Sequence, residues 1–166
     1  MAVKGNIVAT DRHALQDEIP LRTPYTLAID PCNLCNFRCK FCAMQTVEEQ
    51  QSYKKLMMPY DLFCKIIDDI AEFPDKLKVL RINGQGEPTL NPRFCDMVKY
   101  AKQKNVSDWI ETITNGSQLE PELNQKIADS EINRVRISIE SITEQGYKDT
   151  AGVDIDFERF IDNIRD

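Results

Sequence analysis

The sequence predicts an α/β protein built as a parallel (β/α) partial barrel with about four βα units. Four short apolar runs alternate with segments that carry apolar residues at helical spacing, the pattern of βαβ units around a parallel sheet. The unusual motifs of the chain follow directly after these runs, where the carboxyl ends of parallel strands meet. The 166 residues, 42% hydrophobic and 29% charged, are enough for one domain with its own core.

The strands are predicted where β-branched and apolar residues are concentrated between turn signals. The first run is closed by Pro31, and the third is closed by an Asn-Gly dipeptide. Residues 1–24 are interpreted as an N-terminal extension and residues 25–166 as the core domain. The predicted strands are Tyr25–Asp30, Lys78–Asn83, Trp109–Thr114 and Arg134–Glu140.

The helices are predicted from apolar residues that recur every three or four positions. Proline at a first turn and aspartate at an N-cap mark where two of them begin. The polar stretch 45–55 is interpreted as a solvated loop. The predicted helices start near Pro59, run over about Pro92–Gln103 and Pro121–Ala128, and follow the cap Asp156 to the end of the sequence.

The last predicted helix reaches the final residue without a glycine or a breaker, and the fourth strand has no partner on its far side. An uncovered parallel edge is uncommon, so we expect the domain to be incomplete at its C-terminus. The alternative is a helix that ends naturally at the terminus.

The charge and hydropathy of the chain disfavour several classes of partner. A net charge of −6 gives little of the counterion release that drives binding to nucleic acids. No apolar run reaches the ~20 residues that span a bilayer, and the N-terminus lacks the apolar stretch of a secretory signal. We therefore expect a cytoplasmic protein with no membrane partner.

Six cysteines are present, and four of them lie within eleven residues. In a reducing compartment, clustered thiols are interpreted first as metal ligands. Cys35, Cys39 and Cys42 have the spacing C-x3-C-x2-C, and three thiolates on one tight loop can bind three corners of an iron–sulfur cube. The fourth iron then stays open. The alternative is a zinc site that includes Cys32. The isolated Cys64 and Cys95 are expected to pack as small hydrophobic residues.

The C-x3-C-x2-C spacing, with the aromatic Phe41 before the last cysteine, resembles the signature of the radical S-adenosylmethionine (radical SAM) superfamily. The resemblance covers about residues 25–166. It implies a partial or full (β/α) barrel, a [4Fe–4S] cluster on Cys35, Cys39 and Cys42, and S-adenosylmethionine (AdoMet) chelated to the open iron. Reductive cleavage of AdoMet would give a 5′-deoxyadenosyl radical that abstracts hydrogen from a substrate.

The same resemblance implies further cofactor contacts. Gly84-Gln85-Gly86-Glu87-Pro88 is similar to the family's Gly-Gly-Glu element, with a carboxylate for the cofactor's ammonium and a glycine for close approach of the backbone. Thr114 occupies the polar position after strand three. Without the cysteines, both segments are ordinary turns. The cofactor residues expected are Phe41, Gln85, Gly86, Glu87, Thr114, Ser138 and Glu140.

The resemblance is to the branch of the molybdenum-cofactor cyclase and the SPASM enzymes. It implies a peptide, sugar or nucleotide-derived substrate and an electron donor such as flavodoxin or ferredoxin. His13 is the only histidine, so no catalytic side chain is expected beyond the cluster ligands. The alternatives are a zinc-stabilised binding module and a cluster-binding but inactive fragment. For Ser138 and Glu140 the alternative is that they lie on a solvent-exposed face of the sheet and do not contact the cofactor.

Overall fold

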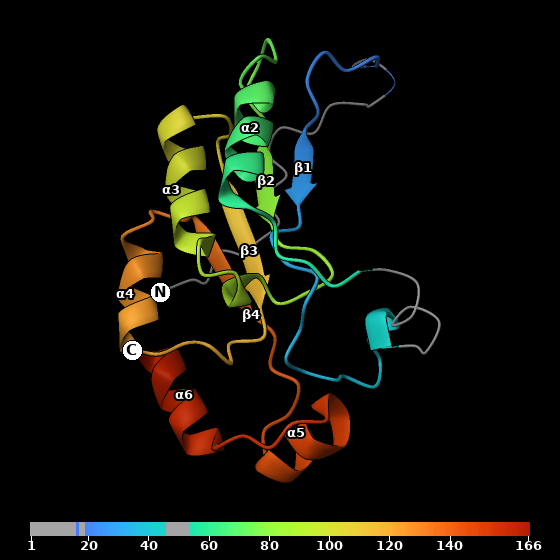
Figure 1. The fold of residues 1–166 in the computed structure, drawn as a ribbon, viewed down its shortest axis with the longest axis vertical. Coiled ribbons are helices and arrows are strands. Elements are labelled where there is room, and N and C mark those ends of the chain that lie inside the picture. Colours follow the sequence, from blue (N-terminus) through green and yellow to red (C-terminus); the bar gives the residue numbers. More distant parts are fainter. Residues whose placement is uncertain (1–15, 17–18, 46–53) are drawn as a thin grey trace.

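A parallel four-stranded sheet forms the centre of the structure (Figure 1). The computed structural model describes residue 16, residues 19–45 and residues 54–166. The strands pair in sequence order, β1-β2-β3-β4, as the βαβ pattern predicts. They are β1 (Thr26–Ile29), β2 (Val79–Ile82), β3 (Ile110–Thr114) and β4 (Arg134–Ile137).

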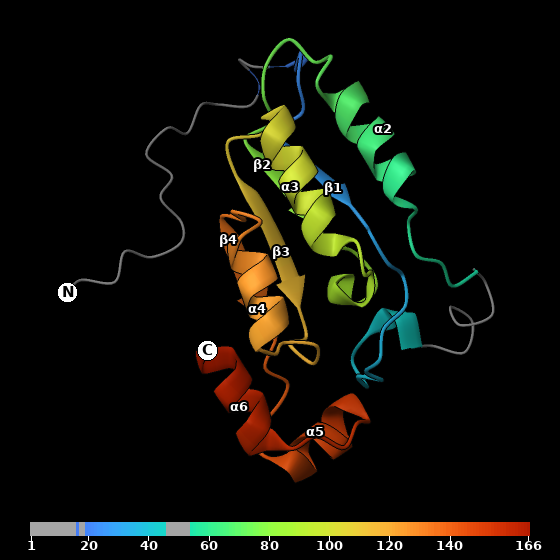
Figure 2. The ribbon, with the colours of Figure 1, turned by 60° about the vertical axis from the view of Figure 1, so that its left-hand side comes forward.

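Three helices, α2, α3 and α4, cover one face of this sheet (Figure 2). Two further helices, α5 and α6, follow β4 and lie beyond the carboxyl ends of the strands (Figure 1). The α-helices are α2 (Tyr60–Ile70), α3 (Phe94–Lys104), α4 (Pro121–Ala128), α5 (Glu144–Ala151) and α6 (Phe157–Arg165), with 3-10 turns η2 (Ala43–Gln45) and η3 (Pro88–Leu90). Within the described ranges, no helix is long and apolar enough to cross a membrane.

The core lies between these helices and the sheet. On α2, Phe63, Ile67 and Ile70 are buried at the spacing that places them on one helical face. They belong to one apolar cluster with Leu80 and Ile82 of β2. Alternate strand residues therefore face the helices, and the residues between them face the opposite side of the sheet.

The helix ends confirm one predicted cap and reveal a helix that the sequence analysis did not predict. Asp156 starts α6, and its side chain accepts a hydrogen bond of 3.0 Å from the backbone N–H of Arg159. The unpredicted helix α5 has Thr143 as its N-cap, whose side chain accepts from the Gly146 N–H, and Gly152 as its C-cap, with a φ of 61°. A threonine cap and a closing glycine were thus the available sequence signals.

The fourth strand is shorter than predicted. It ends at Ile137 and not at Glu140, although the backbone N–H of Ser138 still donates to the carbonyl of Thr114 at 2.9 Å. Beyond that bond the chain leaves the sheet, and the Glu140 N–H donates to the hydroxyl of Tyr147. Ser138 and Glu140 therefore lie on the loop after β4.

Most of the predicted extension 1–24, His13 and most of the predicted loop 45–55 lie outside the described residues. The division of the chain at residues 24 and 25 stays a prediction.

Candidate functional site

The cysteine-bearing loop leaves the carboxyl end of β1 and is held against the next strand by Asp30. One carboxylate oxygen of Asp30 accepts from the backbone N–H of Cys32 at 3.2 Å, and the other accepts from that of Gln85 at 2.8 Å. Asn91 adds a buried bond from its side-chain amide to the carbonyl of Pro31. The start of the loop is thus fixed to the turn that follows β2.

Backbone bonds to α5 hold the middle of the loop. The Arg38 N–H donates to the carbonyl of Ala151 at 2.7 Å, and the Lys40 N–H donates to that of Thr150 at 2.9 Å. These two residues flank Cys39. Helix α5 therefore positions the second cysteine of the motif.

An aromatic cluster formed with helices α5 and α6 packs against the loop. Phe37 is buried and meets Tyr147 of α5 edge to face, with ring centroids 6.1 Å apart. Tyr147 in turn packs on Phe160 of α6 at 5.5 Å. Buried aromatic residues restrict the motion of the backbone that carries them, so the loop is a preorganised support for its thiols.

The three motif cysteines are half-buried on this loop. The N–H of Cys42 donates to the carbonyl of Cys39 at 3.0 Å, which forms a tight turn between the last two thiols. Three soft thiolate ligands on one anchored loop fit an iron–sulfur cluster, whose ligands bind separate irons. In the described part of the chain, no three His, Cys, Asp or Glu side chains gather closely enough to hold a single metal ion.

Cys32 differs from these three. Cys32 is 1% exposed, and its thiol donates to the carbonyl of Leu34 at 3.6 Å. Burial raises the pKa of this thiol. Cys32 is therefore directed into the protein, which disfavours the four-cysteine zinc site.

Burial also raises the pKa of the Cys35 thiol. It raises the pKa of the Cys39 thiol to about 11, and the nearby carboxylate of Glu140 adds a smaller contribution to this second shift. Cysteine binds metals as the thiolate, so cluster assembly releases these protons.

In cluster-free protein, we expect alkylation of Cys39 by iodoacetamide to rise about tenfold per pH unit from pH 8 to pH 10, because the thiolate is the nucleophile and its pKa lies above this range. Peptide mass spectrometry of timed samples measures the rate. A rate that levels off by pH 9 would contradict the raised pKa. Free N-acetylcysteine is the control for the reagent.

Gly86 allows close packing against the backbone of the cysteine loop, whereas the sequence predicted close packing against the cofactor. A Cβ at this position would lie 2.1 Å from the carbonyl oxygen of Cys32 and 2.4 Å from that of Leu34. The N–H of the next residue, Glu87, donates to the Leu34 carbonyl at 2.7 Å. Gly86 therefore lets the turn after β2 approach the backbone of the cysteine loop.

Replacing Gly86 by alanine is expected to displace the cysteine loop and lower the free energy of unfolding by about 2 kcal/mol, because both colliding atoms are backbone. Urea denaturation followed by circular dichroism measures the change. The matched control is Gln85→Ala, since that exposed neighbour makes its bond to Asp30 through its backbone N–H. Equal stability of the two variants would refute the packing role of Gly86.

Glu87 is buried and its carboxylate is bonded within the protein. Oε1 accepts from Thr89 N (3.0 Å), Thr89 Oγ1 (2.5 Å) and Thr114 Oγ1 (2.6 Å), and Oε2 accepts from Asn115 N (2.6 Å). The resemblance to the superfamily predicts that this carboxylate accepts a hydrogen bond from the cofactor's ammonium. In the structure, Glu87 links the turn after β2 to the end of β3.

The last residue of β3 and the residue after it have different contacts. Thr114 is 1% exposed and its hydroxyl is bonded to Glu87, so its side chain does not face an open cofactor site. The side-chain amide of Asn115 instead lies 3.8 Å from Cys35 Sγ and donates to Asn36 Oδ1 at 2.9 Å. Asn115 is a site residue that the sequence analysis assigned only to a turn. Its position in Thr-Asn-Gly was the available signal.

The other expected cofactor residues are more open. Phe41 is 69% exposed beside the last cysteine, so its side chain does not fill the core. The Gln85 side chain is exposed, and Ser138 and Glu140 are half-buried. The structure brings Gly86, Glu87 and Thr114 together with the cysteine loop.

The family model of the radical SAM superfamily matches residues 29–166. The chain belongs to the radical SAM superfamily. A relative from Pyrococcus furiosus, the tungsten-containing aldehyde ferredoxin oxidoreductase cofactor-modifying protein, is 37% identical over 114 residues, which are 69% of this chain and 30% of the relative. A probable GTP 3′,8-cyclase from Methanocaldococcus jannaschii is 30% identical over 84% of this chain and 44% of its own length. The chain thus spans less than half the length of these relatives.

Solved structures agree on the fold. Streptococcus suis SuiB bound to S-adenosylmethionine matches with a TM-score of 0.66 and 18% identity, over 90% of this chain and 34% of that one. Native anSMEcpe with bound AdoMet gives the same TM-score and identity, over 86% of this chain and 41% of that one. The radical SAM partial barrel predicted from the sequence is therefore confirmed. The superfamily uses a [4Fe–4S] cluster and AdoMet.

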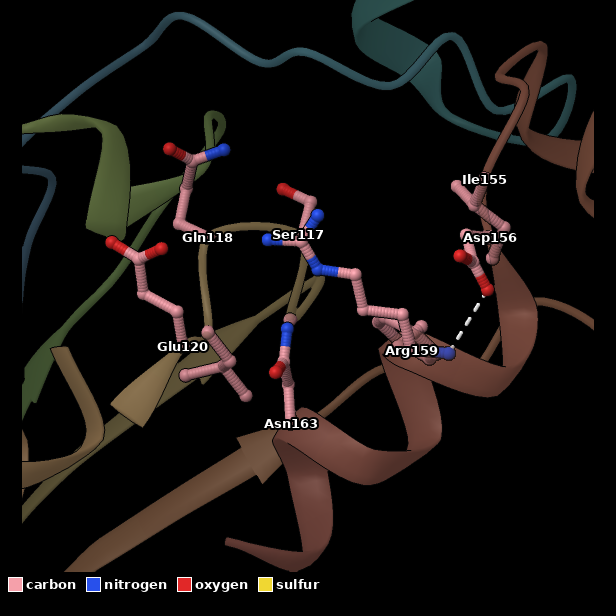
Figure 3. Close-up of a pocket in the computed structure, with 10 residues that line it drawn as sticks. Ser117, Gln118, Glu120, Ile155, Asp156, Arg159 and Asn163 are labelled. Atoms are coloured by element: carbon pink, nitrogen blue, oxygen red, sulfur yellow. Dashed lines mark hydrogen bonds between the residues drawn. The ribbon is translucent and has the colours of Figure 1, made fainter. Parts of the chain in front are cut away.

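A pocket of about 360 Å³ opens beside this site, between the loop after β3 and the first turns of α6 (Figure 3). Ser117 lies on one side, and Asp156, Arg159 and Asn163 lie on α6 or at its start. The Ser117 hydroxyl accepts from the side-chain amide of Asn36 at 2.8 Å. The pocket wall is therefore joined to the loop that carries Cys35.

Proposed function

We propose that this chain is the cluster- and AdoMet-binding part of a radical SAM enzyme. The observation that carries the proposal is the anchored loop of Cys35, Cys39 and Cys42 at the carboxyl edge of the sheet. When bound, the cluster and AdoMet supply a 5′-deoxyadenosyl radical through one-electron reductive cleavage, and that radical abstracts hydrogen from a substrate.

The three cysteines would hold three irons, which would leave the fourth iron for the amino and carboxylate groups of AdoMet. Asn115 donates toward Cys35 Sγ, and such hydrogen bonds tune the potential of an iron–sulfur centre. Glu87 Oε2 positions Asn115 by accepting from the backbone N–H of that residue. This oxygen has one donor among the described residues, so it keeps capacity to accept from an ammonium. Phe41 is exposed beside Cys42, which suits an aromatic cover for the adenine.

Gln85, Gly86, Thr114, Ser138 and Glu140 complete the proposed cofactor set, Gly86 and Thr114 through their support of neighbouring groups. The superfamily implies a substrate and a reductant, and we assign the reductant to a flavodoxin or ferredoxin in the cytoplasm. Relatives are named as a cofactor-modifying protein, the mycofactocin maturase MftC and a GTP cyclase, and SuiB was solved with a precursor peptide. The GTP cyclase and the precursor peptide support a nucleotide-derived or peptide substrate, and a sugar rests on the family resemblance alone.

The test is anaerobic reconstitution with iron and sulfide, followed by incubation with dithionite and AdoMet. We expect brown protein with about four irons per chain and release of 5′-deoxyadenosine, measured by liquid chromatography. The control is Cys39→Ala.

Cluster loading without 5′-deoxyadenosine above the Cys39→Ala level would contradict the catalytic part of the proposal for this chain. Protein that carries zinc and no sulfide would contradict the proposal as a whole.

A further inference from the structure

A cluster of charged side chains lies on the face of the sheet opposite the helices. Arg81 of β2, Glu111 of β3 and Arg136 of β4 alternate with residues of the helix-facing core, so they lie on the other face. Arg134 of β4 joins them. We name these four residues the arginine face.

Glu111 organises the arginine face. Its side chain is 5% exposed, and its carboxylate binds Arg81 Nε at 2.9 Å, Arg136 Nη2 at 3.1 Å and Arg134 Nη1 at 3.4 Å. The strand register places Arg81 beside Glu111 and Glu111 beside Arg134. One buried carboxylate thus orients three guanidinium groups from neighbouring strands.

The arginine face has excess positive charge and free donors. Three guanidinium groups face one carboxylate, in a chain whose net charge is −6. A guanidinium has five N–H donors, whereas in the described part of the chain the bonds of Arg81 and Arg136 to Glu111 use one nitrogen each. Their side chains are 48% and 45% exposed, so the remaining donors are accessible. Such a surface is complementary to an anion.

The arginine face adjoins the candidate site. Glu111 lies three residues before Thr114 on the same strand, a separation of about 10 Å along β3. Asn83, two residues beyond Arg81, has a buried side-chain oxygen that lacks a hydrogen-bond partner among the described residues. The segment between the arginine face and the cysteine loop therefore holds an unpaired polar group inside the protein.

We propose that the arginine face binds an anionic group, a carboxylate or a phosphate, of the substrate whose hydrogen is abstracted. The inference rests on the proposed function and narrows its substrate class to molecules that carry such a group. Arg81 and Arg136 bind the anion with the donors that Glu111 leaves free. Arg134, which is 25% exposed, lies over the ring of Trp109, with its guanidinium carbon 5.1 Å from the ring centroid.

Trp109 is the only tryptophan of the chain, so its fluorescence reports on the arginine face. The experiment titrates the reconstituted chain with orthophosphate and, separately, with succinate, at constant ionic strength set with chloride. We expect a saturable change in fluorescence with one of the two probes. The probe that binds more tightly identifies the anionic group of the substrate as a phosphate or as a carboxylate.

Arg136→Gln and Arg81→Gln are expected to weaken binding of that probe about tenfold each, since each removes a charge-assisted hydrogen bond. The affinity of Arg136→Lys for the probe is expected to lie between those of the wild type and Arg136→Gln, because lysine keeps the positive charge but lacks the planar guanidinium. The matched control is Arg165→Gln, which changes an exposed arginine of α6 that pairs, among the described residues, only with its helix neighbour Asp162. This variant is expected to bind the probe with an affinity within twofold of that of the wild type.

A linear, non-saturating response overturns the inference, as does equal weakening in Arg165→Gln and Arg136→Gln. Iron content and 5′-deoxyadenosine release are measured on the same wild-type preparation. AdoMet cleavage without saturable anion binding refutes the arginine face alone, whereas saturable anion binding without cleavage refutes the proposed function and leaves an anion site.

Discussion

Replacing Cys35, Cys39 or Cys42 by alanine, one at a time, is expected to lower the iron content from about four to below about one per chain and to reduce 5′-deoxyadenosine release to background. Each replacement removes one of three thiolate ligands from a single loop, and a cube held by two cysteines is no longer fixed. Iron and sulfide analysis with the visible absorption spectrum measures loading.

Two controls distinguish this cluster from a zinc site. Cys64→Ala changes a half-buried thiol on α2 and is expected to keep full iron content. Cys32→Ala is also expected to load, because the Cys32 thiol is directed to the carbonyl of Leu34. Loss of metal in Cys32→Ala equal to that in Cys39→Ala would contradict the three-cysteine site and favour four-cysteine coordination.

Glu87→Gln is expected to lower the free energy of unfolding by about 3 kcal/mol. The buried carboxylate accepts four hydrogen bonds, and a glutamine amide would turn one acceptor into a donor that faces another donor. The link between the turn after β2 and the end of β3 would break, and Asn115 would lose its fixed position near Cys35. Urea denaturation of the cluster-free protein measures the loss.

A double-mutant cycle with Thr114 isolates this link. Thr114→Val removes the hydroxyl that donates to Glu87 and keeps the size of the side chain, with an expected cost of about 1.5 kcal/mol. Thr114→Ser keeps the hydroxyl and is the control. Because the two side chains share a bond, the costs of Glu87→Gln and Thr114→Val should not add. Full additivity would show that the Thr114–Glu87 bond contributes nothing.

The sequence predicted the order of the elements because hydrophobic periodicity and turn residues are local signals. The apolar face of α2 and the Asp156 cap of α6 both follow from residues within a few positions of each other. Helix α5 was missed because Ala151 and Tyr147 are its only buried residues, which leaves a weak apolar pattern. The fourth strand was predicted too long because alternation continues after its pairing stops at Ile137.

The sequence by itself determined the cysteine motif, the place of each motif after a strand, and hence the radical SAM family. Tertiary structure decided what the polar residues of these motifs contact. Glu87 binds Thr114 and Asn115 across 27 and 28 positions, and Arg81 and Arg136 meet at Glu111 from separate strands. Such partners depend on strand register and on burial, which arise only when distant segments pack. Spacing along the chain therefore predicts which residues bind the cluster, whereas the contacts that support them depend on the tertiary structure.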